Sequence, residues 1–243
     1  MKANFNIVLI NRAGKVGKST LAKNLIAPML GAEWVQVETI NDSGEGATER
    51  LAGRKFRLVA EATAASMRSL CIDIGSSNYE AAMKEMRQIA GFAEDIDFWV
   101  IPCTNSGSVV NDTEATIEDL VNILDVEPAR IVVIPNRVDR EDMEGFSKLE
   151  HAAREKGFHF ATWGVEDAPM FDVFNKDKRS VMGTAAETKD YRALIHAEAD
   201  PSKRAELSRQ LVKHRQAKSI AGALLEAWSS TPLAALARKA AAS

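Results

Sequence analysis

Apolar and polar residues alternate along most of the chain in blocks that predict strands and helices in turn. Short apolar runs, typical of buried strands, occupy residues 7–10, 34–40, 70–74, 98–104, 130–137 and 158–163. Between them, apolar residues recur at helical spacing over 18–30, 47–68, 79–90, 112–124 and 146–156. Strands that alternate with helices in this way predict an α/β fold, in which a mostly parallel sheet carries helices on both faces.

The strand pattern ends near Thr188, and the remainder of the chain is helical, with breaks at Pro201 and 229–232. No internal repeat or linker interrupts the chain. We therefore expect a single domain over 1–243, with a core of about 1–180 and a helical C-terminal region of about 185–243. The last stretch, from Pro232, predicts a short helix that docks on the core or frays.

The first predicted strand runs into a glycine-containing turn and then directly into the first predicted helix. Strand, glycine loop, Lys-Ser and helix in this order predict a phosphate cradle, because backbone N–H groups and the helix N-terminus favour an anion. The cradle consists of Gly14, Lys15, Val16, Gly17, Lys18, Ser19 and Thr20. Lys18 is expected on the β- and γ-phosphates and the Ser19 hydroxyl on Mg²⁺. Arg12 stands where the usual pattern has its first glycine.

Carboxylates follow two of the predicted strands. Asp73 lies inside an apolar run, where a charge is costly unless it is paired or binds a metal, so we expect it to hold Mg²⁺ or to cap the following loop. Glu38 and Asp42 lie at the end of the second predicted strand, where α/β sheets bind ligands. Either is a candidate for orienting the attacking water, and a solvated turn is the alternative.

A polar segment that begins with Asn136 and Arg137 follows a late strand. An Asn side chain offers both a donor and an acceptor, which suits the edge of a nucleobase, although a turn-forming Asn is an equal interpretation. The segment 136–139 differs by one residue from Asn-Lys-x-Asp, which keeps GTP open as the nucleotide. The loop 165–169 is a candidate to cover the base.

Net charge, cysteine positions and the length of apolar stretches indicate where the protein is expected to work. The 243 residues carry a net charge of −3, so only a local patch could contact nucleic acid. Cys71 and Cys103 lie in apolar runs without disulfide or metal spacing, and no apolar stretch approaches the roughly 18 residues of a membrane span. We expect a cytoplasmic protein with neither a signal peptide nor a membrane span.

One predicted helix is basic. Between 203 and 218 a single acid, Glu206, faces six basic residues: Lys203, Arg204, Arg209, Lys213, Arg215 and Lys218. They could contact DNA phosphates without regard to sequence. The alternative is an ordinary surface helix in which Leu207, Leu211 and Val212 pack inward.

The motif at 13–20, Asp73 and the repeated α/β units resemble the ParA/MinD group of P-loop ATPases over about residues 4–175. Residues 8–11, 14–20 with Ala27-Pro28, and 37–41 look like the StbB-type plasmid stability ATPases. The resemblance implies ATP and Mg²⁺ as cofactors, slow hydrolysis, a nucleotide-dependent homodimer and a plasmid-encoded DNA-binding adaptor. It also implies a role in plasmid stability, partitioning or conjugative transfer.

The loop departs from the ParA/MinD pattern at one position. The lysine that reaches across the dimer in that group corresponds to Ala13 here, and Lys15 stands two residues later. Either Lys15 or Arg12 takes over the contact, or the dimer differs. By the same resemblance, the water-positioning carboxylate is Asp42 by spacing or Glu38 by strand-end pattern.

Three other functions share this pattern. A biosynthetic ATP-dependent ligase uses the same fold but requires a small-substrate pocket. A GTPase switch follows from Asn136 and its neighbours. A nucleotide-binding module with little or no hydrolysis follows from the altered loop.

Overall fold

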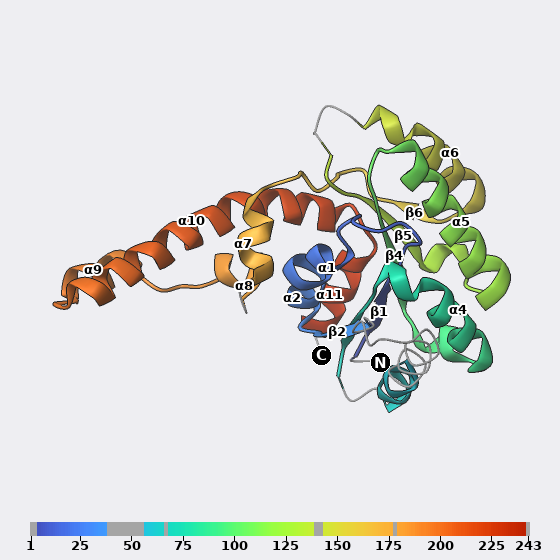
Figure 1. The fold of residues 1–243 in the computed structure, drawn as a ribbon, viewed down its shortest axis with the longest axis horizontal. Coiled ribbons are helices and arrows are strands. Elements are labelled where there is room, and N and C mark those ends of the chain that lie inside the picture. The colour runs from blue at the N-terminus through green and yellow to red at the C-terminus, as the bar shows by residue number, and fades with distance from the viewer. Residues whose placement is uncertain (1–3, 38–55, 66–67, 139–142, 177–178, 242–243) are drawn as a thin grey trace.

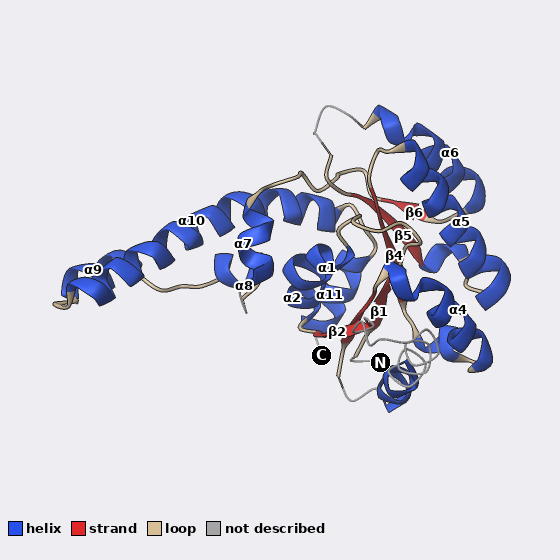
Figure 2. Ribbon diagram, in the orientation of Figure 1, coloured by secondary structure: helices blue, strands red, loops and turns tan. Residues whose placement is uncertain are grey.

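The computed structural model describes residues 4–37, 56–65, 68–138, 143–176 and 179–241. Its strands form one parallel sheet in the order β2-β3-β1-β4-β5-β6 (Figures 1 and 2). Their bounds are β1 Asn6–Leu9, β2 Glu33–Val37, β3 Leu70–Ile74, β4 Phe98–Cys103, β5 Ile131–Pro135 and β6 His159–Phe160. The central strands are buried on both faces, which is why they are apolar without alternation.

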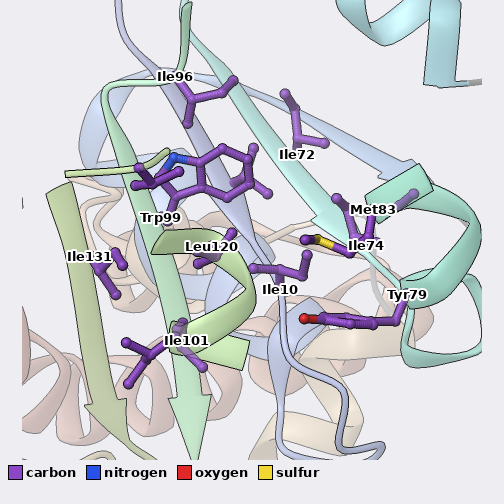
Figure 3. Close-up of a cluster of buried hydrophobic side chains, with 14 of the residues drawn as sticks. Ile10, Ile72, Ile74, Tyr79, Met83, Ile96, Trp99, Ile101, Leu120 and Ile131 are labelled. Atoms are coloured by element: carbon purple, nitrogen blue, oxygen red, sulfur yellow. The ribbon is translucent and has the colours of Figure 1, made fainter. Parts of the chain in front are cut away.

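One face of the sheet is covered by α4 (Tyr79–Gln88), α5 (Gly107–Leu124), α6 (Ser147–Lys156) and the helical residues 56–65. Figure 3 shows the core beneath them, where Trp99 lies among isoleucines from neighbouring strands and Leu120 reaches in from α5. Burying a side chain of this size contributes about 1.5–3 kcal/mol. This face therefore fixes the strands whose ends carry the polar residues described below.

The opposite face carries a continuous helical run from Lys18 to Leu30, which consists of α1 (Lys18–Leu21), a π-helical turn (Ala22–Ile26) and α2 (Ala27–Leu30). C-terminal helices pack beside it: α7 (Met170–Lys176), α8 (Val181–Ala185), α10 (Pro201–Ser229) and α11 (Leu233–Ala241). Leu233 is fully buried in this second core. The predicted terminal helix thus docks.

Helix α9 (Tyr191–Ala197) and the outer part of α10 form an arm, residues 190–214, that extends away from the sheet (Figure 1). Asp200 starts α10, since its carboxylate accepts the backbone N–H of Ser202 at 2.7 Å. At the base of the arm the rings of Tyr191 and His214 meet edge to face, with centroids 5.5 Å apart. The inner part of α10 packs on the body.

The predicted α/β class, with helices on both faces and a helical C-terminal region, is confirmed. Two boundaries differ. Helix α5 begins at Gly107 rather than 112, because Ser106 to Ser108 read as a polar loop although the buried face of the helix starts at Val110. The strand predicted over 158–163 is reduced to two paired residues. Among the described helices, none is long and apolar enough to cross a membrane.

Candidate functional site

The polar residues gather at the carboxyl end of β1, which lies between β3 and β4 in the sheet. After β1 the chain forms β2 and β3 on one side of β1, and then β4, β5 and β6 on the other side. The strand order therefore reverses at β1. Open parallel sheets bind ligands in the crevice at such a point. The glycine loop follows β1 here, and Asp73, paired in register with Leu9, lies in the adjacent β3.

The loop is held in a conformation that admits few residues. Lys15 and Gly17 have left-handed backbone angles, with φ of 60° and 88°. A Cβ on Gly17 would lie 2.0 Å from Asn136 Nδ2, and that same nitrogen donates to the Val16 carbonyl at 2.8 Å. Asn136 therefore supports the loop from β5, and the close approach requires glycine at position 17.

The start of the loop is anchored by Asn11, which is fully buried. Its Nδ2 donates to the Pro102 carbonyl and to Thr113 Oγ1, both at 2.9 Å, and its Oδ1 accepts the Ala13 N–H at 2.9 Å. Because the amide satisfies groups on β4 and α5 at once, it fixes where the loop begins.

Arg12, the residue in place of the first glycine, is held by its own chain. Its guanidinium donates to Asp119 at 2.6 Å and lies 5.3 Å from the centre of the Tyr79 ring. The Tyr79 hydroxyl donates to the same carboxylate at 2.7 Å, and burial together with that carboxylate raises the pKa of Tyr79. This clamp leaves Lys15, which is exposed, as the cation at the tip of the loop.

Lys18 lies under the loop, with 7% of its surface exposed. Its ammonium group donates to the Asn11 carbonyl at 3.1 Å and to the Ala13 carbonyl at 2.8 Å. Burial lowers the pKa of Lys18 to about 8, against the opposing effect of the Asp73 charge. The hydrogen bonds of this ammonium group go to neutral carbonyls beside a helix N-terminus, which is a place that favours an anion.

Asp73 and Ser19 supply oxygen atoms of the kind that Mg²⁺ prefers. Asp73 is 1% exposed, at a depth where a carboxylate needs a cation nearby, and its charge acts on Lys18. Within the described part of the chain, no group of three or more His, Cys, Asp or Glu could hold a metal. The donor set fits a Mg²⁺ ion that completes its coordination with water and phosphate. Glu38 and Asp42 lie outside the described residues.

A cavity of about 320 Å³ adjoins the loop. Its lining includes Thr20, Asn136, Arg137, residues 166–169, Phe171, Asp172 and Asn175. Arg137 is held at a φ of 56°, which is uncommon outside glycine and is found at functional sites. The structure thus brings Asn136, Arg137 and the loop after β6 to one cavity beside Thr20, where a group attached to the phosphates would lie.

The basic residues of α10 are not part of this cluster. Arg204 donates to the Glu198 carbonyl at 2.7 Å, Arg209 pairs with Glu206 at 2.7 Å, and the charge of Lys213 also acts on Glu206. These cations thus have partners within the arm or its helix. Val212, which the surface-helix interpretation expected to pack inward, is 52% exposed. That detail of the expectation is wrong, because α9 and the body cover other sides of α10.

Sequence reasoning missed the asparagines that support the site, Asn11, Asn24 and Asn175, and also missed Asp119. Asn24 is fully buried in the π-helical turn, and Asn175 lines the cavity. The only signal in the sequence was an asparagine inside an apolar helical stretch, which is an unfavourable place for it without a partner.

No protein-family model matches the chain, and no curated protein matches it. The fold is similar to solved ParA/MinD-type ATPases. The MinD cell division protein of Aquifex aeolicus is 16% identical, with a TM-score of 0.48, covering 86% of this chain and 96% of that one. A putative plasmid partition protein from Borrelia burgdorferi B31, bound to AMPPNP, is 14% identical, with a TM-score of 0.48 and 86% and 98% covered.

The apo McdA of Cyanothece is 14% identical, with a TM-score of 0.49, covering 70% of this chain and 89% of that one. Likenesses at this level concern the course of the chain alone. The function proposed below therefore rests on the loop, its lysine and the neighbouring cavity.

Proposed function

We propose that this chain is a Mg²⁺-dependent ATPase that uses slow ATP hydrolysis as a switch between two states. The observation that carries the proposal is Lys18, whose ammonium group is buried under a glycine loop and bonded to the carbonyls of Asn11 and Ala13. These two hydrogen bonds go to neutral acceptors. Phosphates that enter the loop would give the ammonium group charged acceptors instead, and hydrogen bonds between charged groups are stronger.

The residues act by position and charge. The N–H groups of the loop and of the helix that begins at Lys18 bind the phosphates, and Lys18 turns from the two carbonyls to the β- and γ-phosphates. Ser19 and Asp73 would hold Mg²⁺, which neutralises charge that develops on the phosphates. Asp42 or Glu38 would orient the attacking water. Asn136 holds the loop in its conformation through the hydrogen bond to the Val16 carbonyl.

The base would occupy the cavity beside Thr20. Asn136 gives one amide hydrogen to Val16, which leaves its carbonyl oxygen to accept an N–H from the base edge. Adenine and guanine both offer such a donor, so a GTPase is the second candidate, favoured by the placement of Asn136 and Arg137 on the cavity. Competition of ATP and GTP for a fluorescent analogue separates the two.

The biological role proposed for the switch is plasmid stability, partitioning or conjugative transfer, by resemblance of the motifs to StbB-type proteins. In that role the nucleotide would control a homodimer, a DNA-binding adaptor protein would read its state, and the basic face of α10 would bind DNA without sequence preference. Lys15 is the candidate to contact the phosphates of the partner, because Arg12 is engaged by Asp119. The setting for such a role is the cytoplasm.

The direct test is Lys18→Ala, assayed for Mg²⁺-dependent ATP binding and turnover. We expect binding to be lost, because the phosphates lose their buried cation. Lys84→Ala, which removes an exposed lysine of α4, should bind ATP like the unchanged protein. Unchanged ATP affinity in Lys18→Ala, or turnover that requires a small carboxylic acid, would overturn the proposal; the latter result would indicate a ligase.

A further inference from the structure

A chain of hydrogen bonds runs from the phosphate loop to the C-terminal helices. The backbone N–H of Val181, at the start of α8, donates to Asn24 Oδ1 at 3.0 Å. Asn24 Nδ2 donates to Asn175 Oδ1 at 3.0 Å and to the Thr20 carbonyl at 3.1 Å. Asn175 Nδ2 in turn donates to Thr20 Oγ1 at 3.1 Å. The chain connects helices separated by about 150 residues of sequence.

Two backbone groups fix the direction of every bond in this chain. The Val181 N–H can only donate and the Thr20 carbonyl can only accept, so Asn24 presents its oxygen to one and its nitrogen to the other. Asn175 must then present its oxygen to Asn24 and its nitrogen to Thr20. Since Thr20 Oγ1 accepts from Asn175, the hydroxyl hydrogen of Thr20 is directed elsewhere, and Thr20 lines the cavity beside the phosphate loop.

Asn24 lies within the π-helical turn, where the backbone N–H of Ala27 donates to the Ala22 carbonyl five residues earlier. The side chain of Asn24 donates to the Thr20 carbonyl, one turn before it. Lys23, the preceding residue, caps the end of α7, because its ammonium group donates to the carbonyls of Phe174 at 2.6 Å and Asn175 at 2.9 Å.

The far end of the chain of hydrogen bonds reaches α10, the helix whose outer part forms the arm. Helix α8 lies between the π-helical turn and α10, and Val181 is fully buried in the core that both share. A change in the strength of the bonds at Thr20 therefore reaches a helix on which α10 rests. Hydrogen bonds aligned in one direction polarise one another, so a charge at one end strengthens the others.

We infer that Asn24 and Asn175 are positioning residues that orient the Thr20 hydroxyl as a donor to a nucleotide phosphate and couple nucleotide binding to α8 and the arm. This inference rests on the proposed nucleotide site. When a phosphate accepts a hydrogen bond from the Thr20 hydroxyl, Thr20 Oγ1 becomes a better acceptor for the Asn175 amide. The bond between Asn175 and Asn24 is then strengthened, and after it the bond between Asn24 and Val181. Nucleotide binding and the ordering of α8 and the arm thus stabilise each other.

A double-mutant cycle with Thr20→Val and Asn175→Ala tests the orientation, with Mg²⁺-ATP affinity as the readout. Because a hydrogen bond of this kind contributes about 0.5–1.5 kcal/mol, each single variant should lose about three- to tenfold in affinity. The double variant should be no weaker than Thr20→Val, since Asn175 acts through that hydroxyl. Lys176→Ala, the exposed neighbour on α7 outside the cavity lining, is the matched control and should bind normally.

Asn175→Asp separates orientation from simple charge. An acceptor at position 175 turns the Thr20 hydroxyl away from the phosphate, so this variant should bind ATP more weakly than Asn175→Ala. When Thr20→Val is also present, the part of this difference in ATP affinity that depends on the Thr20 hydroxyl should disappear. A difference that persists in full in that background, or additive losses in the cycle, would overturn the inference.

Hydrogen exchange tests the coupling to the arm. In the unchanged protein, Mg²⁺-ATP should slow exchange of the Val181 amide and of α10, and Asn175→Ala at saturating ATP should lose this slowing. Equal slowing in both proteins would overturn the coupling. If the unchanged protein binds no nucleotide at all, the proposed function itself fails; failure of the cycle alone leaves ATP binding intact and removes only the relay.

Discussion

At the scale of single residues, the glycine loop is distinguished by the side chains that hold it in place. Asn136 reaches Val16, Asn11 fixes Ala13, and the clamp of Asp119 and Tyr79 holds Arg12. A glycine at position 12 would leave the loop's first residue free to move. Here an arginine takes that place, and its guanidinium ties the loop to α5. The conformation of the loop is therefore held by contacts within the chain.

The pH dependence of nucleotide binding should follow Lys18. Its pKa in the fold is about 8, below the ordinary 10.5, so between these values the unfolded chain binds more protons and the free energy of unfolding rises with pH. Phosphates need the charged form, so ATP affinity should fall above pH 8, by at most about tenfold per pH unit. Calorimetry in two buffers of different protonation enthalpy should detect proton uptake on binding at pH 9. No uptake there would contradict the assignment.

Gly17→Ala should remove ATP binding and lower stability, and Gly31→Ala is its control. Both glycines have a positive φ, 88° and 58°, but only Gly17 has an atom, Asn136 Nδ2, within 2.0 Å of the new Cβ. The left-handed backbone alone costs about 1–2 kcal/mol, which both variants should show in thermal unfolding. Gly31→Ala should keep its ATP affinity. Equal ATP binding by the two variants would show that the contact with Asn136 is unimportant.

At the scale of secondary-structure elements, the helical run from Lys18 to Leu30 has two functions. Its N-terminus faces the loop, and its π-helical turn binds α7 and α8 through Lys23 and Asn24. Helix α10 is also divided, since its inner part is buried in the body and its outer part forms the arm. Its basic residues lie on the outer and middle turns, where they are exposed or half-buried.

If the basic face of α10 binds DNA, replacing Lys213 and Arg215 by Glu should weaken retention on DNA and reduce the salt slope by about 2, since each phosphate contact contributes about 0.9. The loss should be equal for DNA of unrelated sequences. Lys84→Glu with Arg87→Glu, on the exposed side of α4, changes the net charge equally and should not matter. Similar losses from both pairs would show that overall charge, and not α10, governs the interaction.

At the scale of the whole molecule, the arm extends away from the packed body, and the loop after β1 exposes a lysine. Lys15 is exposed at a φ of 60°, and the arm is formed by α9 and the outer part of α10 (Figure 1). Both faces of the sheet in the body are packed.

Lys15→Ala tests the proposed dimer. We expect the variant to bind ATP as a monomer but to lose the dimer that the unchanged protein forms with a non-hydrolysable analogue, measured by sedimentation velocity. The reason is that Lys15 is exposed while Lys18 and Arg12 are engaged within the chain. A nucleotide-dependent dimer that persists in Lys15→Ala rules this lysine out as the contact to the partner.

The sequence by itself determined the succession of strands and helices along the chain and the place of the glycine loop. Both depend on local patterns, namely apolar runs, helical spacing and the segment from Gly14 to Thr20, which a chain shows whatever its tertiary contacts. The fold class follows from these, because alternating strands and helices leave few ways to cover a parallel sheet.

Only the tertiary structure decided how the site is supported. Asn11, Asn24, Asp119 and Asn175 are ordinary polar residues in the sequence, and their partners lie from 2 to 157 residues away. No local pattern records such pairings, since a hydrogen bond depends on where two elements meet in space. For the same reason the clamp on Arg12 and the relay from Thr20 to Val181 became visible only when the helices were placed around the sheet.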